Sequence, residues 1–491
     1  MAKAASILFA LDLLAGSAPA AELRIGAATV DLTPDKPVAL DGQFHVRISK
    51  GVDNPVQATA VALEGREGDR GGEQAIFLSA DLVNFTPLIC KSLRERLKAS
   101  LPDFDANKLV MTATHTHTAP VVNEGWYKIP EQGVMPTAEY REFLLGRLEE
   151  VVLRAWKARQ PGGVSWGLGY AMVGHPRRSV YADGSAKMYG ATAIPEFRGL
   201  EGASDPGLET LFFWNARKEL LAAGINVACP AQEVENRSTL NADFWHDVRE
   251  HLRTHLAKDL AVLGWPAACG DLSPRRMVRK AAEDRMLKLR GLSPTQEIGR
   301  RIGREVADLC ALVSQDLRTE VPFAHRVEQL TLPVRKVTEE EVSKAEKELE
   351  ARKEKGEKGL RLGWLQATIQ RFRDQGAHPT FTVNVHVLRI GDVAIVTSPF
   401  ELFSDYGMQI KGRSRAEQTF VLELTDGSEQ YLPTARAVAG GGYSAVVQSS
   451  RGGPEAGQML VDRTVEMIHA LWPDPPKAPQ TESPAITPPK T

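Results

Sequence analysis

Residues 109–118 read Leu109-Val110-Met111-Thr112-Ala113-Thr114-His115-Thr116-His117-Thr118. The first five are mostly apolar, which predicts a short buried strand. Side chains two positions apart on extended backbone point to the same side, so both imidazoles can face one ion. In α/β sheets, ligands collect beyond the carboxyl ends of strands. The stretch therefore predicts a metal site at a strand end; the alternative is two histidines that hydrogen-bond to backbone in a turn.

The segments around this stretch predict an α/β architecture. Residues 75–83 have the pattern of a strand and residues 90–100 that of a helix, so the histidine strand completes a βαβ unit. A hairpin is predicted for residues 386–398, with its turn at Gly391-Asp392. Further strands are predicted at 23–34, 58–63, 164–170, 210–214, 223–228 and 266–269, and helices at 140–158, 244–260 and 296–315. We expect mixed β-sheets covered by helices.

The chain has 491 residues, a length that leaves one to three domains open. Residues 22–472 carry the alternating strand and helix patterns and are predicted to form one catalytic domain. Within it, residues 338–375 begin with a run dominated by Glu and Lys, which predicts a solvated helical insertion without chemistry. Residues 473–491 are rich in Pro, Thr and Lys and are predicted to be a disordered tail.

The first 21 residues resemble a secretory leader. Lys3 precedes an apolar run, and small residues with an A-x-A-type cleavage pattern end at Ala21. We predict a signal peptide at residues 1–21 and a periplasmic or secreted protein. The alternative is a frayed N-terminal helix.

The charge is nearly balanced, with 60 basic and 62 acidic residues and a net charge of −2. This balance excludes the basic footprint of a nucleic-acid-binding protein. No apolar run is long enough to predict a membrane-spanning helix. Four cysteines lie far apart in sequence, which argues against a disulfide scaffold, although one bridge between Cys229 and Cys269 is left open.

Three further motifs follow the histidine pair along the chain. They are Gly270-Asp271-Leu272-Ser273-Pro274, Ser398-Pro399-Phe400-Glu401, and Tyr431-Leu432-Pro433-Thr434 followed by Tyr443. In kind and order they resemble motifs of the neutral (non-lysosomal) ceramidase family, over residues 24–471. The resemblance implies the catalytic domain of a divergent member without that family's C-terminal β-sandwich domain.

The same resemblance implies a zinc site. It assigns His115, Glu401 and Tyr443 as ligands, with Tyr431 as the competing tyrosine. His117 is placed in the active site beside the metal, as a metal-site residue and as the group that shuttles protons. Zinc accepts imidazole, carboxylate and phenol oxygen ligands and keeps an open position for water.

Two more residues are implied to act in catalysis. Ser273 would be a nucleophile or would anchor a substrate hydroxyl; the alternative is an ordinary Ser-Pro turn. Arg178, in Arg177-Arg178-Ser179, would face the substrate carbonyl and stabilise an oxyanion; the alternative is an arginine pair on a surface loop.

The sequence departs from the family pattern at the second zinc histidine. Pro230 stands near the expected position, and proline cannot bind a metal. Cys229, Glu233 or His246 are the candidates to replace it.

These observations predict an exported zinc-dependent amidohydrolase. A metal-activated water would hydrolyse an N-acyl, linear amide bond of a small-molecule or lipid substrate. Two alternatives are another metal-dependent ester or phosphoester hydrolase, and a non-catalytic exported protein that retains the fold. The oligomeric state is left open.

Overall fold

The computed structural model describes residues 20–68, 70–357 and 360–472. The predicted leader lies outside these residues except for Ala20 and Ala21, which form the start of the first strand, β1 (Ala20–Asp31), and pair with Val321 and Pro322. The predicted tail at 473–491 also lies outside them.

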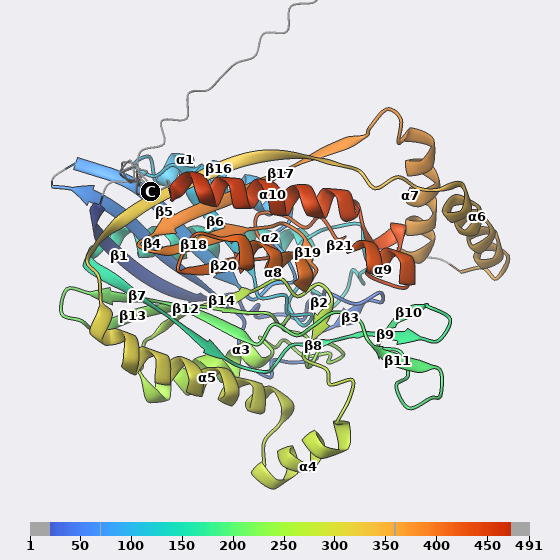
Figure 1. Cartoon of the computed structure of the whole chain (residues 1–491), viewed down its shortest axis with the longest axis horizontal. Coiled ribbons are helices and arrows are strands. Elements are labelled where there is room, and N and C mark those ends of the chain that lie inside the picture. The colour runs from blue at the N-terminus through green and yellow to red at the C-terminus, as the bar shows by residue number, and fades with distance from the viewer. Residues whose placement is uncertain (1–19, 69, 358–359, 473–491) are drawn as a thin grey trace, which may run out of the picture.

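A twelve-stranded mixed sheet organises the molecule (Figure 1). Its neighbouring strands run in the order β14-β13-β12-β7-β1-β16-β17-β18-β20, and β4, β5 and β6 extend a branch from β1. Three pairs, β5 with β6, β13 with β14 and β18 with β20, are parallel. After β1, the strands are β4 (Gln57–Glu67), β5 (Arg70–Ala80), β6 (Leu109–Ala113), β7 (Gln160–Tyr170), β12 (Gly207–Asn215), β13 (Leu220–Val227), β14 (Ala261–Pro266), β16 (Glu320–Pro333), β17 (Thr380–Ile390), β18 (Val393–Thr397) and β20 (Gln418–Leu422).

The inner faces of this sheet share one core. Trp265 on β14 lies at its centre, with ring centroids 5.3 Å from Phe77 of β5 and 6.1 Å from Phe420 of β20. β14 and β20 are the two ends of the strand order, and β5 belongs to the branch from β1. These parts of the sheet must therefore face one another around Trp265. One hydrophobic core is thus formed between facing parts of the sheet, in addition to the cores between the sheet and its helices.

Three groups of helices cover the outer faces. α1 (Pro87–Ser100) and α2 (Thr137–Lys157) cover β1 and β4, α3 (Phe244–His255) and α5 (Pro294–Val313) cover β12 to β14, and α8 (Ser404–Arg413) and α10 (Pro454–Leu471) cover β16 to β18. α5 shows why such segments are helical. Ser293 and Gln296 form a capping box before it, and its buried residues recur at helical spacing: Ile298, Ile302, Val306 and Leu309.

The charged segment forms a helical hairpin at one end of the molecule, α6 (Glu339–Glu354) and α7 (Leu360–Asp374) (Figure 1). Its two helices share a small apolar core that includes Leu349, Leu365 and Val447. The predicted helical insertion is therefore present.

Smaller sheets surround the region beyond the strand ends. They are β2 (Ala39–Leu40) with β3 (Arg47–Ile48), β8 (His175–Pro176) with β15 (Leu272–Ser273), β9 (Arg178–Tyr181) with β10 (Ala186–Met188) and β11 (Phe197–Leu200), and β19 (Glu401–Leu402) with β21 (Tyr431–Leu432). A further helix is α4 (Lys280–Arg290), and α9 is a short helix at Ala435–Gly440.

The structure confirms the α/β class, the βαβ unit β5-α1-β6 and the hairpin β17-β18. Several predicted boundaries shift. For example, the strand predicted at 266–269 ends at Pro266, and the helix predicted to reach residue 260 ends at His255. The long strand β16 and helices α4 and α10 were not predicted. In β16 the buried positions change phase, from Val321, Phe323 and His325 to Leu330 and Leu332. This break in the alternation, with Pro322 and Pro333 near the ends, obscures the strand pattern.

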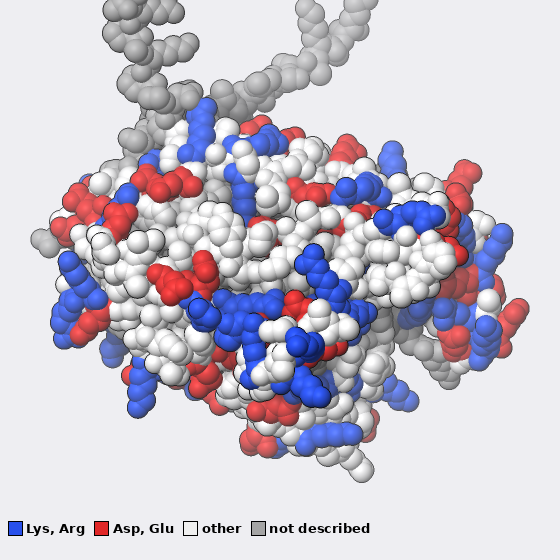
Figure 2. Space-filling model, turned by 60° about the horizontal axis from the view of Figure 1, so that its bottom comes forward, with Lys and Arg blue, Asp and Glu red and all other residues white. Residues whose placement is uncertain are grey.

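The surface mixes both signs of charge. On the face in Figure 2, basic side chains gather near the centre and acidic ones lie around them. No helix among residues 20–68, 70–357 and 360–472 is long and apolar enough to cross a membrane. All four cysteines are buried and free, so the bridge between Cys229 and Cys269 that the sequence left open is not formed.

Candidate active site

The candidate site lies where four loops leave the carboxyl ends of β6, β13, β14 and β18. These loops carry, respectively, the two histidines, Gln232 with Glu235, the Gly270–Ser273 turn, and Glu401. This arrangement agrees with the rule that α/β sheets place ligands beyond strand ends.

His115 is held with one ring nitrogen free. Its Nδ1 lies 2.7 Å from the carbonyl oxygen of Val83. A carbonyl only accepts hydrogen bonds, so Nδ1 carries the proton and Nε2 of the neutral ring keeps its lone pair. That Nε2 lies 3.5 Å from Oε2 of Glu401 and 3.4 Å from Nε2 of His117. The backbone of His115 has a φ of 65°, a strained value for a residue with a side chain.

His117 is fixed on both ring nitrogens. Its Nε2 lies 2.9 Å from Nε2 of Gln232, and Oε1 of Gln232 accepts from Arg177 at 3.2 Å. With its oxygen engaged, Gln232 donates from Nε2, so His117 accepts there and carries its proton on Nδ1. Nδ1 lies 3.4 Å from Oε2 of Glu235. Arg47 holds the backbone by donating to the carbonyl of His117 at 2.5 Å.

Charge around the pair follows from burial and contact. Burial raises the pKa of Glu401, but the contact with His115 outweighs burial and leaves that pKa below its ordinary value. The pKa of His115 is correspondingly raised, because Glu401 outweighs the opposing effect of burial. Burial lowers the pKa of His117 despite the nearby Glu235, which favours the neutral ring.

Of the two candidate tyrosines, Tyr431 is the one in direct contact with Glu401. β19 and β21 pair these two residues, and the Tyr431 hydroxyl donates to the Glu401 carboxylate. The hydroxyl of Tyr443 forms a hydrogen bond with that of Tyr431, and the two ring centroids are 5.4 Å apart. Burial raises the pKa of Tyr443 to about 12, so its hydroxyl is protonated at neutral pH. The predicted ligand Tyr443 therefore reaches Glu401 only through Tyr431.

The two adjacent arginines have different surroundings. Arg178 is fully buried, forms an ion pair with Glu201 at 2.8 Å, and donates to the carbonyls of Ala437, Gly441 and Tyr443. Through these hydrogen bonds Arg178 stabilises α9 and the loop after it. The placement therefore does not support the prediction that Arg178 faces the substrate.

Arg177, one residue earlier, contacts the residues around the histidine site. Its guanidinium donates to the Tyr431 hydroxyl at 3.3 Å and to the Gly270 carbonyl at 2.8 Å, in addition to Gln232. One residue of register separates it from Arg178, and successive side chains of an extended segment point to opposite sides.

Ser273 is buried one step behind these groups. Its Oγ accepts from the hydroxyl of Tyr189 at 3.1 Å and from the backbone of Arg275 at 3.0 Å. Tyr189 in turn accepts from Arg177 at 3.4 Å. Ser273 is thus connected to the histidine site through Tyr189 and Arg177.

The rest of that motif joins the loops. At Gly270, an added Cβ would lie 2.3 Å from the Glu401 carbonyl oxygen, so only glycine permits this approach of the two backbones. The neighbouring Asp271 carboxylate accepts two hydrogen bonds from Ser404, at 2.7 Å from its backbone and 2.9 Å from its hydroxyl. Burial raises the pKa of Asp271 to about 6. The Gly-Asp pair therefore fixes the position of Glu401.

The segment after β13 brings an unexpected residue to the histidines. The thiol of Cys229 contacts the carbonyl oxygens of Val173 and Pro230, and Glu233 lines a different small pocket with Arg276. His246 lies in the first turn of α3. The side chain that contacts His117 is Gln232. Sequence reasoning missed it because an amide carries no metal-ligand signature.

Two separations at the site have the size expected between zinc ligands. Ligands bound tetrahedrally at about 2.1 Å are separated by about 3.4 Å. The separations of His115 Nε2 from Glu401 and from His117 match this value. Over the described part of the chain, however, no three His, Cys, Asp or Glu side chains converge on one metal position. His115 and Glu401 therefore fit zinc only when a phenol oxygen completes the set, and Tyr431 supplies the nearest one.

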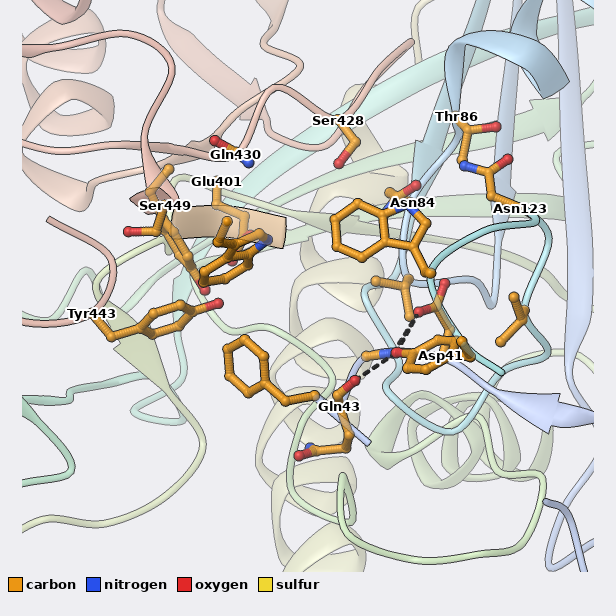
Figure 3. Close-up of a pocket in the computed structure, with 18 of the residues that line it drawn as sticks. Asp41, Gln43, Asn84, Thr86, Asn123, Glu401, Ser428, Gln430, Tyr443 and Ser449 are labelled. Carbon is orange, nitrogen blue, oxygen red and sulfur yellow. Dashed lines mark hydrogen bonds between the residues drawn. The ribbon is translucent and has the colours of Figure 1, made fainter. Parts of the chain in front are cut away.

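A cavity of about 260 Å³ leads to this group (Figure 3). In Figure 3, Tyr443, Glu401 and Ser449 lie on one side and Asp41 and Asn84 on the other. The cavity is lined by aromatic and polar side chains: Phe44, Trp126, Tyr127, Trp364, Tyr431 and Tyr443, with Asp41, Gln43, Asn84, Asn123, Ser428, Gln430 and Ser449 among the polar ones. Trp364 belongs to α7, so the helical insertion also lines the cavity.

Comparison with known proteins identifies the fold. No family model and no curated protein matches the sequence. Among solved structures, neutral ceramidase from Pseudomonas aeruginosa matches with a TM-score of 0.66 and 17% identity, over 92% of this chain and 74% of that chain. A ceramidase complexed with C2 matches with a TM-score of 0.65 and 16% identity, over 92% of this chain and 75% of that chain. The chain has the neutral ceramidase fold.

The neutral ceramidase fold accounts for how four sequence motifs come together. The histidine pair, the Gly270–Ser273 turn, Glu401 and Tyr431 lie far apart in sequence and meet at one end of the sheet. Arg177, Gln232 and Glu235 were missed as site residues. Of these three, only Arg177 had a sequence signal, because it directly precedes the predicted residue Arg178.

Proposed function

We propose that this protein is a zinc-dependent amidohydrolase of neutral ceramidase type that cleaves an N-acyl amide bond. The observation that carries the proposal is the meeting of His115, Glu401 and Tyr431, with His117 beside them, where Glu401 and Tyr431 line a cavity. The likeness of the fold to neutral ceramidases supports an amide hydrolase, and the site residues suggest its mechanism.

His115, Glu401 and Tyr431 are proposed to hold the metal, with the fourth position open. A bound zinc ion supplies a Lewis acid, which polarises the amide carbonyl and lowers the pKa of a bound water to about 7. Val83 prepares His115 for this role by fixing the proton on Nδ1. The predicted ligand Tyr443 is replaced by Tyr431 in this proposal because Tyr431 contacts Glu401 directly.

His117 is proposed as the proton-transfer group rather than as a ligand. Its Nε2 lies 3.4 Å from Nε2 of His115 and accepts from Gln232. In this proposal Nε2 exchanges the Gln232 hydrogen bond for a proton, which the leaving amine later receives. Glu235, next to Nδ1, stabilises the imidazolium that forms. Burial raises the pKa of Glu235, but His117 and Arg275 outweigh burial and keep it low, so Glu235 is charged.

Arg177 and Ser273 are proposed to position other groups. Arg177 orients both Gln232 and the Tyr431 hydroxyl, so it fixes His117 and the phenol together. Ser273 holds Tyr189 against Arg177. In this proposal Ser273 supports the site and is not the nucleophile.

The lining of the cavity favours amides over phosphoesters. Among the described residues that line it, the charged ones are Asp41 and Glu401, and none is Lys or Arg. Beyond the proposed zinc, a phosphate group would meet two carboxylates and no basic side chain of this lining, whereas an amide is neutral. Export, and a periplasmic or secreted location, remain proposals that rest on the leader-like N-terminus.

The experiment compares His115→Ala, His117→Ala and a control, His378→Ala, an exposed histidine after α7. We expect His115→Ala to lose zinc and amidase activity together. His117→Ala should keep the zinc and lose activity by about 10² to 10⁴-fold, and the control should change neither. Zinc is measured by mass spectrometry and activity on a panel of N-acyl amides, carboxylic esters and phosphate esters.

Three outcomes contradict the proposal. Unchanged zinc in His115→Ala removes the ligand assignment. Higher activity on esters or phosphates than on amides assigns another hydrolase. Wild-type protein that binds no zinc, even after supplementation, supports a non-catalytic protein with this fold.

A further inference from the structure

The helical insertion forms part of the wall of the cavity through Trp364. Its indole stacks parallel to Tyr443, with ring centroids 6.1 Å apart and an interplanar angle of 5°. Phe44 meets both rings edge-on, at 5.3 Å from Trp364 and 5.6 Å from Tyr443. Tyr443 also contacts Tyr431, so this aromatic wall runs from the insertion to the proposed metal ligands.

The wall is assembled from three distant segments. Phe44 lies between β2 and β3, Trp364 on α7, and Tyr443 after α9. Offset and edge-to-face aromatic pairs are stabilised beyond their buried area, which makes the wall an ordered surface. α7 is in turn held to the domain by Arg371, which donates to the carbonyls of Val447 and Ser450.

The volume behind this wall is small. A cavity of roughly 150 Å³ holds one benzene molecule. At the same packing, the 260 Å³ here holds about ten non-hydrogen atoms. A lipid amide with two long hydrocarbon chains is far larger.

The lining of the cavity is not continuously apolar. Gln43, Asn84, Asn123, Ser428 and Gln430 line it with polar groups. A long hydrocarbon chain lying against these amides and hydroxyls would desolvate them without giving them partners. A short acyl group avoids this cost because it ends at the aromatic wall.

We propose that Trp364 is a specificity-determining residue that limits the substrate to small N-acyl amides of about ten non-hydrogen atoms, with the short acyl group against the Trp364, Phe44 and Tyr443 wall. This inference rests on the proposed amidohydrolase function and narrows its substrate class. Long-chain lipid amides are outside that class.

The test uses two amides with the same amine, N-methylhexanamide and N-methyldodecanamide, and measures released methylamine. We expect wild-type kcat/KM to favour the shorter amide by at least tenfold. Trp364→Ala should reduce this preference at least tenfold, mainly by improving the longer substrate. Gln366→Ala, an exposed change on the same helix, should leave the preference unchanged.

A wild-type enzyme that cleaves both amides with equal kcat/KM overturns the inference while the proposed function stands. An unchanged preference in Trp364→Ala overturns it as well. If neither amide is cleaved, the proposed function fails, and calorimetric binding of the two amides replaces the rates. Tighter binding of the hexanamide that is lost in Trp364→Ala then supports the wall, and equal binding overturns it.

Discussion

Gly42→Ala tests whether the position of His117 matters as the structure implies. Gly42 has a φ of +92°, and a Cβ added there would lie 2.4 Å from Cγ of His117. Ordinary contact begins at 3.4 Å, so the ring or the loop must move by about 1 Å. The ring cannot retreat freely, because Gln232 and Glu235 hold its nitrogens and Arg47 holds its backbone.

Two costs are expected, and a second glycine separates them. Alanine at positive φ costs about 1–3 kcal/mol, and this cost is shared by Gly184→Ala, where φ is +82° and nothing lies within 4 Å. The clash adds about 1–3 kcal/mol only at Gly42. A misplacement of about 1 Å also lowers catalytic rate by about 10²-fold.

The assay combines urea unfolding with initial rates of amide hydrolysis for both variants. We expect Gly42→Ala to unfold with about 1–3 kcal/mol less free energy than Gly184→Ala and to be about 100-fold slower. Equal stability and equal rates in the two variants refute the reasoning, because they mean that His117 is not confined by Gly42. If the protein has no amidase activity, the stability difference alone decides.

Three further predictions test the other assignments. Arg178→Ala should lower the free energy of unfolding by about 3–5 kcal/mol, because it leaves the buried Glu201 carboxylate unpaired. Arg177→Lys should mainly lower kcat. Urea unfolding and rates at saturating substrate separate the two effects, and a purely catalytic defect in Arg178→Ala contradicts the structural role of Arg178. Burial raises the pKa of Glu423 from 4.5 to about 8. Between these values the unfolded chain releases a proton that the folded protein keeps, so the free energy of unfolding falls with rising pH by up to about 1.4 kcal/mol per pH unit. In urea unfolding, Glu423→Gln should therefore gain more stability over wild type at pH 8 than at pH 5, and an equal difference at both pH values counts against the burial argument. Tyr431→Phe should weaken zinc binding about 10 to 100-fold, and Tyr443→Phe should bind zinc about as well as wild type. Competition with a chelator measures both affinities. Weaker zinc binding in Tyr443→Phe than in Tyr431→Phe would restore Tyr443 as the ligand.

The sequence by itself determined the local elements and the residue types of the site. Apolar periodicity predicted β6, the βαβ unit and the β17-β18 hairpin, because side-chain spacing on strands and helices is a local property. The motifs marked His115 and Glu401, whose side-chain atoms lie 3.5 Å apart in the structure. Their chemistry is visible in residue types alone.

Only the tertiary structure decided which neighbour within each motif lies at the proposed site. Arg177 rather than Arg178 contacts Tyr431, and Tyr431 contacts Glu401. Gln232 contacts His117, and Trp364 lines the cavity. A shift of one residue on extended backbone turns a side chain to the opposite side, and no local pattern shows which side another segment will cover. The packing of distant loops, and of the inserted helix α7, resolves that choice.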